Sequence, residues 1–294
     1  MSSSWRNYEI LVERIKDPFG IILMTGPTGS GKSTTLYAFL QILNQEERNI
    51  ITLEDPVEYF IEGLNQSQVK PEIGYTFANG LRTILRQDPN VIMVGEIRDG
   101  ETAELAIHAA LTGHLIFSTV HTNDAIGTIP RLVDMGIEPF LLASSLRVVA
   151  AQRLVRQICG ACKTKDELPA AVVEKIKREV EEIPQAELQK YGVDISNGLS
   201  FSHGPGCEEC NNMGFKGRLA IYEVLEVNTK VQEIISEKRD CEADLKAEGA
   251  RQGMVTMRQD GLLKVLLGHT TLSEVERVTE GSASVGGDTD DDRG

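Results

Sequence analysis

The segment GPTGSGKS, residues 26–33, constrains the fold of this chain more than any other, because it fits the phosphate-binding loop pattern GxxxxGK[ST]. Gly26 and Gly31 allow backbone angles that a Cβ atom would forbid, so the loop amides can point inward at the N-terminus of a helix. Such a loop joins a buried strand to a helix. The apolar run at 20–26 and the helical pattern at 30–45 supply both, which favours a phosphate site over a plain glycine turn.

The residue types in this loop indicate a nucleotide that is bound together with Mg²⁺. Lys32 would reach the β- and γ-phosphates, and Ser33 would be a ligand of the Mg²⁺ ion. We expect the nucleotide to contact the whole loop and the residue that follows it, namely Gly26, Pro27, Thr28, Gly29, Ser30, Gly31, Lys32, Ser33 and Thr34.

The chain before Cys159 alternates apolar strands with helices, which is typical of an α/β fold with parallel strands and right-handed crossovers. Residues 57–80 are expected to be loop, because glycine and proline interrupt them repeatedly. Strands are expected at 20–26, 49–56, 91–99 and 114–124, and helices at 5–16, 30–45, 77–89, 100–113, about 125–136 and 139–157.

Acidic residues follow two of the expected strands, at the sheet edge where ligands bind in open α/β sheets. Glu96 comes directly after VIMVG, and its side chain is long enough to position a water molecule at the γ-phosphate. The alternative for Glu96 is a solvated acid after a strand. Glu54 and Asp55 end the strand at 49–56, where they would hold the water shell of the metal ion or an arginine. A cap or turn role before a proline is the alternative for this pair.

One histidine also lies at this edge. His121 follows FSTV at the end of a strand and could hydrogen-bond the γ-phosphate, although a single histidine is usually structural. His114 is a weaker candidate, and His108 lies inside an expected helix.

Four of the five cysteines form two CxxC pairs, Cys159 with Cys162 and Cys207 with Cys210. Four thiolates are the ligand set of a closed structural zinc site, although one pair alone could be a redox dithiol. The 44 residues between the two pairs would make the metal a clamp at the base of a helical excursion. The remaining cysteine, Cys241, is expected to be a small core residue.

The charge and the hydropathy narrow the possible functions. Thirty basic and 44 acidic residues give a net charge of −14, so we expect no nucleic-acid partner. We find no run of about 18 apolar residues and no secretory signal, so a cytoplasmic protein is expected. The small, polar and acidic stretch at 282–294 is expected to be disordered.

Four motifs in order resemble those of the ATPases of type II secretion and type IV pilus assembly. The Walker A loop is GPTGSGKSTTLYAFL, the aspartate box is ITLEDPVEY, the Walker B region is LRTILRQDPNVIMVGEIRD, and the histidine box is GHLIFSTVHTNDA. The cysteine pairs point to the assembly and secretion branch of the family. The resemblance extends over about residues 5–280.

The resemblance implies a RecA-like P-loop ATPase core at 1–157, a tetracysteine subdomain at 158–212 and a mainly helical subdomain at 213–281. It implies ATP, Mg²⁺ and zinc, a hexameric ring, and platform proteins of the inner membrane as partners on the cytoplasmic side. It makes Glu96 the catalytic glutamate, and it places Glu54 in the aspartate box and His121 and His114 in the histidine box.

Family members carry a further domain before the ATPase core that supplies arginine fingers, and only about 20 residues precede this P-loop. We therefore expect either a truncated ATPase half or an abbreviated member of the family, with slow hydrolysis on its own. Arg82, Arg86 and Arg98 are local cations that the sequence does not assign as fingers. A RecA-like nucleic-acid translocase and a nucleotide-binding scaffold with little turnover are the alternative functions.

Overall fold

The computed structural model describes residues 6–196, 198–237 and 241–280, which form two compact units. The first unit contains the described residues up to Arg153, together with Ile183–Gly192 and Tyr222–Thr256. The second contains Leu154–Glu182, Val193–Ile221 and the described residues from Met257 onward. The domain boundaries expected from the sequence stay predictions, and the tail at 282–294 lies outside the described residues.

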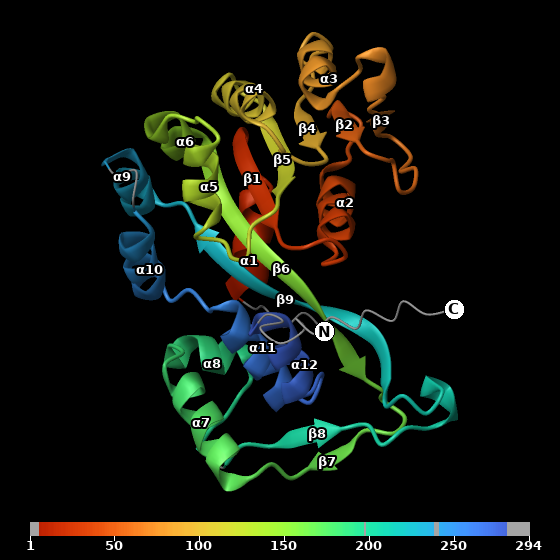
Figure 1. Ribbon diagram of the computed structural model, residues 1–294, viewed down its shortest axis with the longest axis vertical. Helices are drawn as coiled ribbons and strands as arrows, with labels where there is room; N and C mark the ends of the chain where they lie inside the picture. Colours follow the sequence, from red (N-terminus) through yellow and green to blue (C-terminus); the bar gives the residue numbers. More distant parts are fainter. Residues whose placement is uncertain (1–5, 197, 238–240, 281–294) are drawn as a thin grey trace, which may run out of the picture. The chain divides into compact units, whose positions relative to one another are not determined.

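A seven-stranded sheet organises the first unit, in the order β3-β2-β4-β5-β1-β6-β9 (Figure 1). The strand that leads into the phosphate-loop motif, β1, lies between β5 and β6 and is parallel to both. On the other side of β5, the strands β4, β2 and β3 are parallel in turn. The strands are β1 (Gly20–Thr25), β2 (Ile50–Glu54), β3 (Asn65–Gln68), β4 (Val91–Val94), β5 (Leu115–Val120), β6 (Leu146–Ile158) and β9 (Phe215–Glu226).

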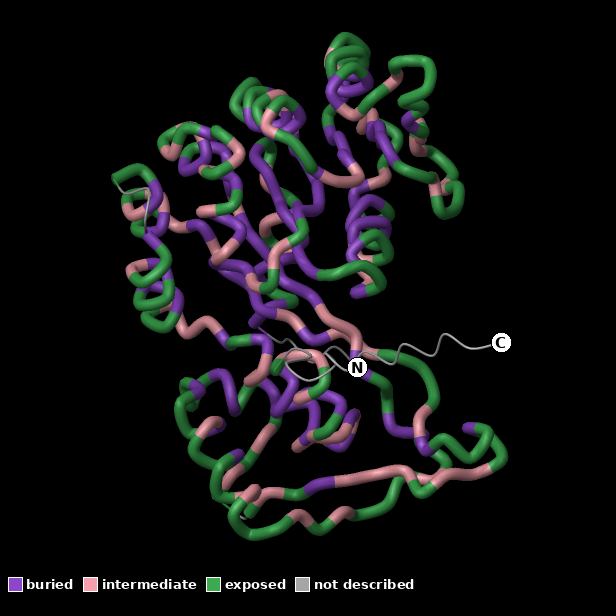
Figure 2. Tube along the Cα trace, in the orientation of Figure 1, coloured by how far each residue is buried: buried purple, intermediate pink, exposed green. Residues whose placement is uncertain are grey.

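The central strands are buried along their whole length, as Figure 2 shows for β1, β2, β4 and β5. Apolar side chains on both faces of a strand are characteristic of parallel sheets that helices cover on both sides. The helices of this unit are α1 (Arg6–Arg14), α2 (Lys32–Leu43), α3 (Phe77–Ile84), α4 (Gly100–Leu111), α5 (Thr128–Asp134), α6 (Pro139–Ser145), α8 (Gln185–Tyr191), α9 (Thr229–Glu237) and α10 (Glu242–Arg251).

The second unit combines a two-stranded antiparallel sheet with helices. Helix α11 contacts α7, α12 and β8, so the helices enclose this small sheet on one side. The elements are β7 (Thr164–Asp166), α7 (Ala170–Glu181), β8 (Phe201–His203), the 3₁₀ turn η2 (Glu208–Cys210), α11 (Met257–Leu266) and α12 (Leu272–Thr279). No helix in the described ranges is long and apolar enough to cross a membrane.

Apart from the segment at 57–80, the structure confirms the expected α/β order up to α5, but it corrects the helix expected at 139–157. Only Pro139–Ser145 are helical, and Leu146–Ile158 form the long strand β6. Leucine, alanine, glutamine and arginine favour a helix intrinsically, but this propensity is weak compared with pairing and burial beside β1.

The loop expected at 57–80 is also wrong in part. It contains the edge strand β3 and the 3₁₀ turn η1 (Pro71–Ile73). The strand NQSQ has no apolar alternation to reveal it, because an edge strand with exposed side chains does not need one. The helices that follow β9 among the described residues are α9, α10, α11 and α12, in agreement with the mainly helical character expected there.

Replacing Phe117 by Ala should lower the free energy of unfolding by about 3–5 kcal/mol, because the ring is fully buried on β5 against Phe39 of α2. Urea unfolding followed by circular dichroism measures the loss. The control Phe60→Ala removes a ring that is 86% exposed and should change stability by less than about 0.5 kcal/mol. Equal effects of the two variants would contradict the position of the core.

Candidate functional site

The loop between β1 and α2 adopts a conformation that requires glycine. Gly26, Gly29 and Gly31 have φ angles of 143°, 77° and 86°, which side chains rarely permit. A Cβ atom on Gly26 would also lie 2.5 Å from the carbonyl oxygen of Gln152 on β6. The spacing of the glycines in the sequence thus follows from the backbone path at the carboxyl end of β1.

Lys32 is the first residue of α2, and its ammonium group turns back over the loop. The Nζ atom donates hydrogen bonds to the carbonyl oxygens of Gly26, at 2.8 Å, and Pro27, at 3.1 Å. Burial lowers the pKa of Lys32, the negative charge of Glu96 raises it, and the positive charge of Arg153 lowers it further. The loop therefore has a buried cation at its centre.

The loop also offers polar groups that are not engaged within the protein. The Oγ atom of Ser30 is buried and has no hydrogen-bond partner among the described residues. Pro27, Thr28, Gly29, Ser33 and Thr34 are exposed beside it. A cation, an orphaned hydroxyl and the start of a twelve-residue helix make this loop fit a phosphate group, and the exposed Ser33 hydroxyl fits a metal ion that accompanies it.

Glu96 and His121 lie together at the same sheet edge, after β4 and β5. The Nε2 atom of His121 is 3.2 Å from a carboxylate oxygen of Glu96. The turn at 95–97 is fixed to the neighbouring strand, because the Thr119 hydroxyl donates to the Gly95 carbonyl at 2.8 Å and the Ile97 amide donates to the Thr119 carbonyl. The parallel register of β4 and β5 thus brings together two residues that are 25 positions apart.

Arg98 completes this cluster. It forms an ion pair and a hydrogen bond with Glu96, and its guanidinium lies 3.8 Å from Asp55. Burial alone would raise the pKa of Glu96, but Arg98 and then His121 outweigh it and hold that pKa below its ordinary value. Because the Glu96 charge also acts on Lys32, the acid lies within electrostatic range of the loop.

Glu54 points into a different network. Its buried carboxylate accepts hydrogen bonds from the hydroxyls of Tyr37 and Thr52 and, at 3.2 Å, from the amide of Gln66. Burial and the Glu54 carboxylate raise the pKa of Tyr37. The network ties α2 to β2 and β3.

The other candidate side chains are not brought to the loop. The Nδ1 atom of His114 lies 2.8 Å from the Ala109 carbonyl at the end of α4, and His108 lies 3.7 Å from Glu104 on the helix surface. Arg82 pairs with Glu101 at 2.5 Å, also on the surface. Arg86 is exposed.

The contribution of β6 to this site was not predicted from the sequence. Gln152 and Arg153 lie beside Gly26, because β6 pairs with β1 and Ala151 stands opposite Thr25. The apolar run LRVVAA is the signal that could have revealed it, since such a run suits a buried strand as well as the helix expected at 139–157.

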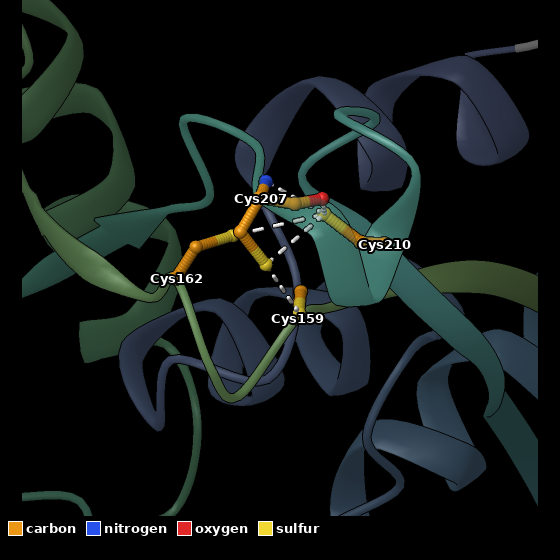
Figure 3. A group of neighbouring side chains, drawn as sticks. All are labelled: Cys159, Cys162, Cys207 and Cys210. Atoms are coloured by element: carbon orange, nitrogen blue, oxygen red, sulfur yellow. Dashed lines mark hydrogen bonds between the residues drawn. The ribbon is translucent and has the colours of Figure 1, made fainter.

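The four cysteines of the CxxC pairs converge in the second unit (Figure 3). Their sulfur atoms all lie within 4.8 Å of one another, with separations of 3.8 Å for Cys159–Cys207, 3.9 Å for Cys162–Cys210 and 3.7 Å for Cys207–Cys210. Four thiolates around one zinc ion at the usual bond length would stand about 3.8 Å apart. The cluster therefore has the composition and the spacing of a tetrahedral zinc site.

Backbone amides prepare one of these sulfurs for metal binding. The amides of Cys207 and Gly214 donate to the Cys210 sulfur at 3.2 and 3.3 Å. Burial would raise the pKa of the Cys210 thiol, but these donors outweigh it and bring the pKa to about 7. The loop at 204–214, which carries Cys207 and Cys210, needs glycine, because a Cβ atom on Gly204 would lie 2.1 Å from the Gly214 carbonyl oxygen.

Known proteins resemble this chain in sequence and in fold. The family described as "Type II/IV secretion system protein" matches residues 1–277. The type II secretion system protein E of Dickeya dadantii is 50% identical over 275 residues, which are 94% of this chain and 51% of the relative. The type IV pilus assembly ATPase PilB of Myxococcus xanthus is 47% identical over 265 residues, which are 90% of this chain and 44% of the relative. This chain thus spans about half the length of these curated relatives.

A solved structure extends the likeness to three dimensions. In the crystal structure of the pilus retraction motor PilT with bound ADP, the sequence is 32% identical to this chain and the TM-score is 0.66. The match covers 92% of this chain and 64% of the PilT chain. The RecA-like P-loop fold that the motifs imply is therefore confirmed. Because the family model matches residues 1–277 and the phosphate loop and the four clustered cysteines are formed in the structure, the chain belongs to the type II/IV secretion system protein family.

Proposed function

We propose that this chain binds Mg-ATP at residues 26–34 and hydrolyses it as the nucleotide-handling part of a motor for type II secretion or type IV pilus assembly. The observation that carries the proposal is the phosphate loop itself, in which the Lys32 ammonium turns back onto the Gly26 and Pro27 carbonyls and the buried Ser30 hydroxyl has no partner among the described residues. The ADP bound in the PilT crystal structure and the name of PilB, a pilus assembly ATPase, support the same chemistry.

The loop residues bind and orient the nucleotide. The amides of Thr28 to Ser33 and the ammonium of Lys32 hold the phosphates, and the Ser33 hydroxyl holds the Mg²⁺ ion, which would neutralise charge that develops on the phosphate oxygens. When the nucleotide binds, the Lys32 ammonium exchanges its hydrogen bonds to the Gly26 and Pro27 carbonyls for hydrogen bonds to phosphate oxygens, which are stronger acceptors because they are charged.

Glu96 is the proposed catalytic residue, because it follows β4 at the edge of the sheet where the loop begins and Arg98 and His121 hold its pKa low, so that it stays ionised. An ionised carboxylate can accept a proton from a water molecule or hold that water in line with the γ-phosphate. Arg98 and His121 act as positioning residues, since both hold the carboxylate in place and lower its pKa.

Glu54 is proposed to act through helix α2, which follows the loop. Through Tyr37 it fixes the first turns of α2, and its neighbour Asp55 lies at the mouth of the site near Arg98. The role of Glu54 as a catalytic acid and that of His114 in the histidine box stay predictions.

The cysteine cluster is proposed to be a structural zinc site. Four thiolates complete the tetrahedral coordination of a zinc ion and leave no position for a substrate, so the metal would stabilise the second unit rather than take part in hydrolysis. The segment 158–212 would then be a zinc-binding subdomain, as the CxxC pairs near its two ends suggest.

We further propose a homo-oligomeric ring, hexameric by the resemblance, which works on cytoplasmic parts of inner-membrane platform proteins. The names of two relatives, a type II secretion system protein and a type IV pilus assembly ATPase, support a part in secretion or pilus assembly. A nucleic-acid translocase is the second candidate; hydrolysis that nucleic acid strongly stimulates would favour it.

Replacing Glu96 by Gln should lower kcat for ATP hydrolysis by about 10²-fold or more and change the ADP dissociation constant by less than about threefold. Phosphate release and calorimetric ADP binding measure the two effects. The control Glu101→Gln alters an exposed acid on α4 and should keep the wild-type rate. Indistinguishable rates for wild type and Glu96→Gln would remove Glu96 from catalysis, and binding without turnover would identify a scaffold.

Replacing Arg98 by Gln should move the acidic limb of the hydrolysis rate to higher pH. Arg98 lowers the pKa of Glu96, so its removal lets Glu96 become protonated, and therefore inactive, at a higher pH than in the wild type. The rate as a function of pH at saturating ATP measures the shift, and Arg82→Gln should leave the limb in place. An unshifted limb in Arg98→Gln would contradict the role assigned to the ion pair.

Metal analysis of protein purified without chelator should give one zinc ion per chain. The variant Cys162→Ser should lose this ion. The control Cys241→Ala should keep it, because Cys241 lies outside the cluster. Removal of the metal should increase hydrogen exchange at 159–162 and 207–214, since closed zinc sites contribute folding energy directly. Amides of β1 should stay protected. Zinc-free protein with reduced thiols and unchanged exchange would contradict the proposal.

A further inference from the structure

We infer that Arg153 is a second cationic ligand of the nucleotide, which contacts the phosphates that ADP and ATP share. The inference rests on the proposed function and assigns a role to a residue on β6 that lies in none of the four motifs. It concerns the side of the phosphate loop that faces away from Glu96.

The register of the sheet puts Arg153 beside the loop. Ala151 stands opposite Thr25, so the next residues of β6 flank the first residue of the loop. A Cβ atom on Gly26 would lie 3.0 Å from the Nη1 atom of Arg153. The absence of a side chain at Gly26 therefore lets the guanidinium come within contact distance of the loop backbone.

Within the part of the chain that the structure describes, the guanidinium has only backbone acceptors at hydrogen-bond distance. Its Nη2 atom donates to the Asn123 carbonyl at 2.8 Å and its Nη1 atom to the Gln152 carbonyl at 3.1 Å. Among the described residues, no carboxylate lies within ion-pair distance of it; Asp124 and Glu223 act on its charge from farther away. A guanidinium has five N–H donors, so it retains donors for an incoming anion.

Arg153 and Lys32 are two cations at one loop. Burial lowers the pKa of both, and the charge of Arg153 lowers that of Lys32. Holding two partly desolvated positive charges together costs free energy unless an anion lies between or beside them. A polyphosphate chain in the loop supplies that anion, and its terminal and inner phosphates can each take one cation.

The strand order decides which phosphate Arg153 serves. Strand β1, which carries the loop, has β5 and then β4 on one side and β6 on the other. Glu96 and His121 follow β4 and β5, so the phosphate that is hydrolysed lies on that side. Arg153 lies on the β6 side, and it therefore binds the inner phosphates rather than the γ-phosphate.

The test compares three variants by isothermal titration calorimetry with Mg-ADP, the ATP analogue AMP-PNP with Mg²⁺, and inorganic pyrophosphate. Arg153→Gln keeps a shorter polar side chain but removes the charge, and Arg153→Lys keeps the charge. Arg147→Gln is the matched control, because Arg147 lies at the opposite end of the same strand, where it stacks on Phe19. Thermal unfolding without ligand is measured for each variant.

Arg153→Gln should raise the dissociation constants of all three ligands by about tenfold, which corresponds to about 1.4 kcal/mol. Arg153→Lys should raise them less, and Arg147→Gln should bind each ligand within about twofold of wild type. Loss of ADP binding with unchanged pyrophosphate binding would assign Arg153 to the ribose or the base and overturn the inference. Equal losses in both Arg153 variants, with a lower unfolding temperature in each, would show a structural role and also overturn it. If the wild type binds ADP and Arg153→Gln binds it equally well, only this inference fails; if the wild type binds none of the ligands, the proposed function fails as well.

Discussion

The conformation of the backbone at 26–31 is the constraint on which the rest of the site depends. Three glycines with positive φ turn the chain sharply at the end of β1, so that α2 begins directly over the loop and the Lys32 ammonium returns to it. A side chain at Gly26 would collide with β6. The close pairing of β6 with β1 and the glycine at the start of the loop therefore require each other.

The parallel sheet converts this local turn into a site with opposite charges on either side of the nucleotide position. Strands β4 and β5 deliver Glu96 and His121 on one side, and β6 delivers Arg153 on the other. The Arg98 ion pair keeps Glu96 ionised, while the two cations at the loop favour an anion there. The structure thus separates the groups suited to binding phosphate from the group suited to activating water.

Motifs with a strict backbone requirement were predictable from the sequence, whereas features decided by tertiary pairing were not. The glycines of the loop, the apolar runs of β1, β4 and β5, and the paired cysteines carry their own physical reason, and each lies where the sequence indicates. The residues of β6 resemble a helix because Leu, Ala, Gln and Arg carry helix propensity, which pairing with β1 overrides. The position of Arg153 beside the loop was hidden for the same reason. The partners of Glu54 could not be inferred, since Tyr37, Thr52 and Gln66 meet only through the fold.

A structure of the chain with Mg²⁺ and AMP-PNP tests the central claim most directly. The account predicts that the phosphates lie within the amides of 28–33, with the Lys32 ammonium on the terminal phosphates and the Glu96 carboxylate separated from the γ-phosphate by one water molecule. A nucleotide bound elsewhere, or a Glu96 carboxylate that faces bulk solvent away from the γ-phosphate, would contradict it.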